Sequence, residues 1–170
     1  IGTRPVDLHL FALKKLGTKI KIKNGYIYAT ATKGLKGNTI KFPSISVGAT
    51  ENAILSAVCA KGKTIIYNCA IEPEINNLIE FLRKMGSKIN LKKRTITIEG
   101  NIYKKKISHK IIPDRIELGT YLIAGALTGK NLTIKNIQTN IIRKEIEILK
   151  KIGVKMKILK NLIQVTSSEN

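Results

Sequence analysis

The stretch Phe81-Leu82-Arg83-Lys84-Met85-Gly86-Ser87-Lys88-Ile89 decides the fold, because related forms of it occur three times in the chain. The other two copies are Phe11-Ala12-Leu13-Lys14-Lys15-Leu16-Gly17-Thr18-Lys19-Ile20 and Ile148-Leu149-Lys150-Lys151-Ile152-Gly153-Val154-Lys155-Met156. Each copy is typical of the end of an amphipathic helix, a glycine that stops it, and an alternating strand. The glycines recur at intervals of 69 and 67 positions, which indicates an internal repeat.

A second strand follows each copy after a short turn: Tyr26-Ile27-Tyr28-Ala29, Thr95-Ile96-Thr97-Ile98 and Leu162-Ile163-Gln164-Val165. The dipeptide Asn24-Gly25 in the first of these turns predicts a tight hairpin. The upstream halves repeat as well. One helix is expected to open at Gly48-Ala49-Thr50 and run to Gly62, and another to open at Gly119-Thr120 and run to Gly129. A strand follows each helix, Thr64–Asn68 and Leu132–Asn136.

One repeat therefore reads strand, helix, strand, helix, strand, strand, which predicts an α/β fold. Residues 1–31 hold the last helix and hairpin of one repeat, 38–100 a full repeat, and about 107–167 another. Because the sequence enters this pattern in mid-repeat, we expect that an N-terminal part is missing. The first small-residue helix lacks a strongly polar face, so we expect it to be buried together with Cys59. The second helix of each repeat is charged and should face solvent.

The composition is strongly basic, with 31 Lys and Arg against 11 Asp and Glu and a net charge of +20. This charge favours a nucleic acid or an anionic small molecule as ligand. However, the lysines are spread along the whole chain, and frequent Lys, Ile and Asn are typical of an A/T-rich genome. Cys59 and Cys69 have no partner motif for a metal. No signal peptide or long apolar run is present, which indicates a cytoplasmic protein without a membrane partner.

Four motifs are candidates for function: Ile1–His9, Pro43–Asn52, Glu72–Ile75 and Ile112–Glu117. The second could bind an anion, because serines and a glycine precede a helix whose first N–H groups are free. The paired carboxylates of the third could serve acid–base chemistry. Each motif is equally consistent with an ordinary capped or proline-led helix start.

Taken in order and spacing, these motifs resemble the UDP-N-acetylglucosamine 1-carboxyvinyltransferase family of enolpyruvyl transferases. The resemblance covers nearly all of residues 1–167. It implies two domains, each made of three α/β units around buried parallel helices, an inside-out α/β barrel. This chain would be incomplete at both ends, with 1–112 the back part of the first domain and 113–170 the first unit of the second.

The resemblance also implies a site. It assigns nucleotide-sugar binding to Arg4, Pro5, Val6, Asp7, Leu8, Ser44, Ile45, Ser46 and Val47. The family has a lysine or a proline near the start of the second loop; here this run is Pro43-Ser44, so the resemblance implies no lysine contact there. The reactive cysteine of the family would precede Ile1, so we expect no catalytic residue, metal or cofactor in this chain.

The implied substrates are UDP-N-acetylglucosamine and phosphoenolpyruvate, whose enolpyruvyl group passes to the sugar 3-hydroxyl in peptidoglycan precursor synthesis. The chain alone should be inactive and should need the remainder of its polypeptide. One alternative is the related enolpyruvyl transferase of aromatic (shikimate) biosynthesis. A basic nucleic-acid-binding module is another, supported by charge alone, and a degraded gene remnant is a third.

Overall fold

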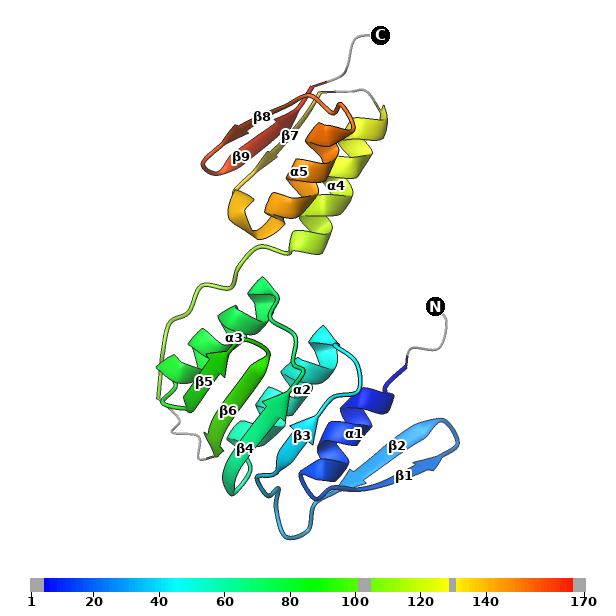
Figure 1. Ribbon diagram of the computed structural model, residues 1–170, viewed down its shortest axis with the longest axis vertical. Coiled ribbons are helices and arrows are strands. Elements are labelled where there is room, and N and C mark those ends of the chain that lie inside the picture. Colours follow the sequence, from blue (N-terminus) through cyan, green and yellow to red (C-terminus); the bar gives the residue numbers. More distant parts are fainter. Residues whose placement is uncertain (1–4, 101–104, 129–130, 167–170) are drawn as a thin grey trace. The chain divides into compact units, whose positions relative to one another are not determined.

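The computed structural model describes residues 5–100, 105–128 and 131–166 (Figure 1). The chain forms two compact units, residues 1–109 and 110–170. Each unit has its own hydrophobic core.

The described residues of the first unit form three helices and two sheets. Its elements are α1 (Asp7–Lys15), β1 (Lys19–Lys23), β2 (Tyr26–Thr30), β3 (Thr39–Lys41), α2 (Val47–Val58), β4 (Gly62–Tyr67), α3 (Pro73–Lys84), β5 (Lys88–Lys92) and β6 (Thr95–Gly100). The larger sheet has the order β3-β4-β6-β5, with β3 parallel to β4 and the other pairs antiparallel. The segment from β3 to β6 therefore has the predicted order of one full repeat.

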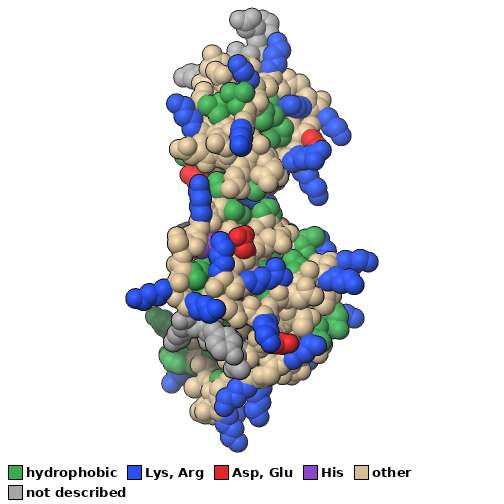
Figure 2. All heavy atoms as spheres, turned by 90° about the vertical axis from the view of Figure 1, so that its left-hand side faces the viewer, with side chains coloured by type: hydrophobic (Ala, Val, Ile, Leu, Met, Phe, Trp, Pro, Cys, Tyr) green, Lys and Arg blue, Asp and Glu red, His purple; other side chains and the backbone are tan. Residues whose placement is uncertain are grey.

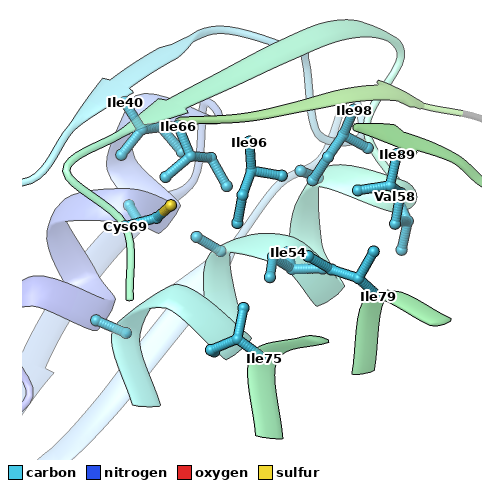
Figure 3. Packing of buried hydrophobic residues seen from close by; sticks show 14 of the residues in the cluster. Ile40, Ile54, Val58, Ile66, Cys69, Ile75, Ile79, Ile89, Ile96 and Ile98 are labelled. Carbon is cyan, nitrogen blue, oxygen red and sulfur yellow. The ribbon is translucent and has the colours of Figure 1, made fainter. Parts of the chain in front are cut away.

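The core of the first unit lies between this sheet and helices α2 and α3 (Figure 3). Ile40, Ile66 and Ile96, from three neighbouring strands, are fully buried against the small residues of α2. Helix α3 has the amphipathic pattern expected of the second helix, since Ile75 and Ile79 are buried and Glu80, Arg83 and Lys84 are exposed. The alternation of isoleucine with polar residues thus places one face of each strand in the core.

Strands β1 and β2 form a separate two-stranded hairpin (Figure 1). Its turn residues Asn24 and Gly25 have φ values of 50° and 77°, the left-handed backbone that the Asn-Gly pair accommodates. Every residue of β2 is exposed. The hairpin is therefore held mainly by its own ladder.

The second unit repeats the order of the first from α2 onward, although its own first helix is largely exposed, with Leu118, Leu122 and Gly125 as its buried residues. Its elements are α4 (Arg115–Thr128), β7 (Leu132–Lys135), the short 3₁₀ helix η1 (Thr139–Ile142), α5 (Arg143–Lys151), β8 (Met156–Leu159) and β9 (Leu162–Val165). Its sheet has the order β7-β9-β8. The positions Asn68 and Asn136 end matching strands and share a left-handed backbone, with φ values of 56° and 58°. The predicted repeat is confirmed by these shared features.

Four expectations about element limits and burial were wrong. Helix α2 ends at Val58, and α4 already begins at Arg115 because Asp114 caps it. The described residues just before α4 form no strand; His109 instead packs its ring on Phe81 of α3, with centroids 5.5 Å apart. Cys59 is exposed, since it lies on the side of α2 that faces away from the sheet.

Candidate functional site

The first turns of α1, α2 and α3 gather at one end of the first unit. His9 of α1 meets Asn52 of α2, and the carboxylates of Glu51 in α2 and Glu74 in α3 are close enough to repel each other. Helix starts carry a partial positive charge, and three of them together favour an anionic ligand at this end.

The start of α2 is capped by its own sequence. Ser46 is the N-cap residue, and its Oγ accepts a hydrogen bond of 3.3 Å from the Ala49 N–H. The Thr50 N–H and hydroxyl both bond the Ser46 carbonyl, at 3.0 and 2.7 Å. The N–H groups of Val47 and Gly48 have no acceptor in the described part of the chain. They are the donors that an anion could use.

The Thr50 side chain ties this helix start to the loop before α3. Its Oγ1 accepts a 3.0 Å hydrogen bond from the buried Ala70 N–H while its own hydrogen goes to Ser46. The start of α2 is therefore held in place by groups that do not need a ligand.

His9 lies directly beside the start of α2. Asn52 Nδ2 donates to His9 Nδ1 at 3.1 Å, which leaves the proton of the neutral ring on Nε2. A Cβ atom on Gly48 would lie 3.3 Å from His9 Cε1, so glycine leaves room for the ring. His9 and Asn52 are 43 positions apart in the sequence, so the place of His9 beside the start of α2 depends on helix packing and not on a local pattern.

Carboxylates balance the positive helix starts. Burial raises the pKa of Glu51 above its usual 4.5, and the Glu74 carboxylate raises it further, while His9 acts in the opposite direction. Glu72 accepts a 2.7 Å bond from the Ile71 N–H ahead of Pro73, the first residue of α3. The Glu72–Ile75 motif is therefore observed as a proline-led helix start.

The structure brings the two predicted nucleotide-sugar segments to the same end of the first unit. Arg4 lies outside the described residues. Pro5, Val6 and Asp7 are exposed at the start of α1, and Leu8 packs partly against the core. Ser44 and Ile45 are exposed, whereas Ser46 and Val47 are half-buried where α2 begins. The contact of His9 with Asn52 joins these two segments.

The fourth motif forms a different helix start in the second unit. Asp114 Oδ1 accepts hydrogen bonds from the Ile116 and Glu117 N–H groups at 2.7 and 3.2 Å. This aspartate is a conventional N-cap, and the capping geometry accounts for its position.

The basic side chains do not form one continuous patch on the face drawn in Figure 2, where Lys and Arg are spread over both units. The described residues contain no group of three or more His, Cys, Asp or Glu arranged to hold a metal ion. In the same part of the chain, no helix has the length and apolar character needed to cross a membrane.

The fold defines a class of protein. The crystal structure of the enolpyruvyl transferase NikO from Streptomyces tendae superposes with a TM-score of 0.83 at 22% sequence identity, over 96% of this chain and 42% of that one. An EPSP synthase from Acinetobacter baumannii superposes with a TM-score of 0.69 at 19% identity, over 97% of this chain and 40% of that one. The repeated units thus have the enolpyruvyl transferase fold.

Sequence comparison gives the family. The family model of EPSP synthase (3-phosphoshikimate 1-carboxyvinyltransferase) matches residues 1–170, and the chain belongs to this family. Curated relatives named UDP-N-acetylglucosamine 1-carboxyvinyltransferase include those of Pelagibacter ubique (strain HTCC1062), 56% identical over 99% of this chain, and Endomicrobium trichonymphae, 48% identical over 100%. The chain spans 41% of the length of each of these two relatives.

Proposed function

We propose that this chain is the nucleotide-sugar-binding part of a UDP-N-acetylglucosamine 1-carboxyvinyltransferase, a cytoplasmic enzyme of peptidoglycan precursor synthesis. The complete enzyme would transfer the enolpyruvyl group of phosphoenolpyruvate to the sugar 3-hydroxyl and release phosphate. The observation that carries this proposal is the identity of 56% with a relative of that name along 99% of the chain. Residues 1–112 would belong to the first domain of the enzyme and 113–170 to the second.

The start of α2 supplies a physical reason for substrate binding. The Val47 and Gly48 N–H groups would donate to the diphosphate, aided by the positive helix end. The segment from Arg4 to Leu8 would hold the nucleoside, because His9 fixes α1 beside this helix start. We propose Ser44, Ile45, Ser46 and Val47 as the second group of contacts. All of these residues bind; none would take part in bond making.

The test is a titration of the ¹⁵N-labelled chain with UDP-N-acetylglucosamine, followed by NMR. Saturable shifts are expected for Val47, Gly48 and the first turn of α1. Ser46→Asp preserves the N-cap but places a negative charge beside the diphosphate, so binding should be lost. Ser46→Asn also preserves the cap without the charge and is the matched control.

Two results would contradict the proposal. One is equal binding by Ser46→Asp and Ser46→Asn, which would mean that the start of α2 does not receive the diphosphate. The other is preferential binding of shikimate 3-phosphate, which would favour the related enzyme of aromatic biosynthesis. Melting temperatures of both variants check that the cap is intact.

A further inference from the structure

A second place in the first unit combines cations, an aromatic ring and a fixed backbone. A hollow of about 740 Å³ lies where β3 and β4 end and β6 begins. Its described lining includes Lys41, Tyr67, Lys93 and Arg94, and none of the described lining residues is a carboxylate. Its volume is in the range of small-molecule sites.

Strand pairing holds the lining side chains in place. Lys41 of β3 lies opposite Tyr67 of β4, which in turn lies opposite Thr95 of β6. These three residues point away from the core, because their neighbours Ile40, Ile66 and Ile96 are fully buried. The lysine and the tyrosine therefore belong to the sheet face opposite α2 and α3.

Hydrogen bonds to backbone carbonyls fix the rim of the hollow. Asn68 Nδ2 donates to the Phe42 carbonyl at 3.0 Å, and the Phe42 N–H donates to the Tyr67 carbonyl at 3.2 Å. Arg94 Nη1 donates to the Cys69 carbonyl at 3.1 Å. A guanidinium has five N–H donors, so this bond holds Arg94 in position and leaves other donors for a ligand.

The residues of the turn between β5 and β6 suit ligand binding better than they suit turn stability. Its first residue, Lys93, has a φ of 54°, and the matching residue of the first hairpin is Asn24 with a φ of 50°. Asparagine suits this left-handed backbone, whereas lysine is strained there. The lysine-rich composition accounts for a lysine but not for the adjacent Arg94, since only five of the 31 basic residues are arginine.

We propose that this hollow is an anion site that takes a phosphate-bearing small molecule. Arg94 would form paired hydrogen bonds to phosphate oxygens, and Lys41 and Lys93, which have no ion-pair partner in the described residues, would add charge. Tyr67, whose side chain is 40% exposed, would contact the rest of the ligand. The described lining of the hollow includes neither Ser46 nor Val47 and Gly48 of α2, and the proposal does not depend on the proposed function.

The experiment is an NMR titration of the ¹⁵N-labelled chain with inorganic phosphate at low ionic strength. The expected result is saturable shifts at Asn68, Lys93, Arg94 and Thr95. Arg94→Gln should weaken phosphate binding roughly five- to ten-fold, because a charge-assisted bond is lost at a solvent-open site. Lys160→Gln is the control. Lys160 lies in the matching turn of the second unit, and its replacement by glutamine removes one positive charge, as Arg94→Gln does.

Lys93→Asn separates binding from folding. It should leave the melting temperature unchanged or raise it, because asparagine tolerates the left-handed backbone, and it should still weaken phosphate binding. Arg94→Gln also removes the hydrogen bond to the Cys69 carbonyl and could disturb the fold, whereas Lys93→Asn leaves that bond intact. The proposal is overturned if the shifts are confined to Val47 and Gly48, if they do not saturate, or if Lys160→Gln weakens binding as much as Lys93→Asn.

Discussion

The two cysteines have opposite surroundings. Cys69 is buried, and burial raises the pKa of its thiol, while Cys59 is exposed at the end of α2. Because the thiolate is the reactive form, iodoacetamide should modify Cys59 at nearly the rate of a free thiol and Cys69 only when the unit opens. Mass spectrometry of the labelled chain checks this, with Cys59→Ser as the control that should lack the fast phase. Equal rates for the two thiols would show that α2 is packed differently.

Glycine is required at one position of β6 and is dispensable in α4. A Cβ on Gly100 would overlap the carbonyl of Ala60, which is backbone and cannot rotate away. We expect Gly100→Ala to cost about 1–3 kcal/mol of unfolding free energy. A Cβ on Gly119 meets no atom within 4 Å. Gly119→Ala should therefore stabilise α4 by about 0.5–1 kcal/mol.

Urea unfolding, followed by NMR signals from each unit, measures both glycine variants. A first unit that stays as stable with Gly100→Ala as without it would contradict the close approach of β6 to Ala60.

Glu51 should destabilise the fold in its charged form. Its pKa is raised first by burial and second by Glu74, so the folded chain holds the proton more tightly than the unfolded chain does. The stability linked to this proton is present below the unfolded value of 4.5 and is lost as pH rises through the folded pKa. Glu51→Gln should thus raise the melting temperature at pH 7. The expected gain in unfolding free energy is less than about 1 kcal/mol, because Glu51 is only partly buried.

The gain from Glu51→Gln should shrink as the pH falls toward 4.5. Glu80→Gln serves as the control, because Glu80 is exposed and pairs with Lys84 at 3.3 Å; it should bring no gain. Melting curves of both variants between pH 4.5 and 7 test this. A gain in melting temperature from Glu51→Gln that does not depend on pH would contradict the raised pKa of Glu51.

At the scale of residues, sequence patterns predicted contacts within a segment better than contacts between segments. The turn at Asn24-Gly25 and the proline-led start of α3 follow from local backbone chemistry. The exposure of Cys59 depends on what packs over α2, which no local pattern contains. The convergence of Lys41, Tyr67 and Arg94 depends on strand register and was not predicted for the same reason.

At the scale of elements, the hairpin β1–β2 should be the least protected part of the first unit. Strand β2 matches β6 in the repeat, but β6 pairs on both edges and β2 pairs only with β1 in the described chain. An isolated two-stranded hairpin is marginally stable. We expect its amides to exchange with deuterium on the order of a hundred-fold faster than those of β4 and β6.

Amide exchange measured by NMR tests the hairpin directly, with the β5–β6 hairpin of the same chain as the internal control. Equal protection of the two hairpins would contradict the exposure of β2.

The order of helices and strands was predictable because each repeat ends a helix with glycine and continues with an alternating strand. The strand expected before α4 was not found, because His109 packs on Phe81 in the first unit.

At the scale of the whole molecule, the segments from α2 to β6 and from α4 to β9 share one order of helices and strands, and the chain has the fold of the enolpyruvyl transferases. This fold was predictable from the period of 67 to 69 residues together with the family motifs. The complete active site was not, since the chain spans 41% of the Pelagibacter ubique relative. The proposed activity must therefore be measured in a chain of the relative's full length.

The most direct measurement replaces the matching segment of the Pelagibacter ubique relative with these 170 residues. The account predicts that the folded graft releases phosphate from phosphoenolpyruvate only when UDP-N-acetylglucosamine is present. Arg4→Ala in the graft should raise KM for the nucleotide sugar and leave kcat nearly unchanged, because Arg4 would bind the nucleotide end. A folded graft that releases no phosphate, or that uses shikimate 3-phosphate instead, would contradict the account.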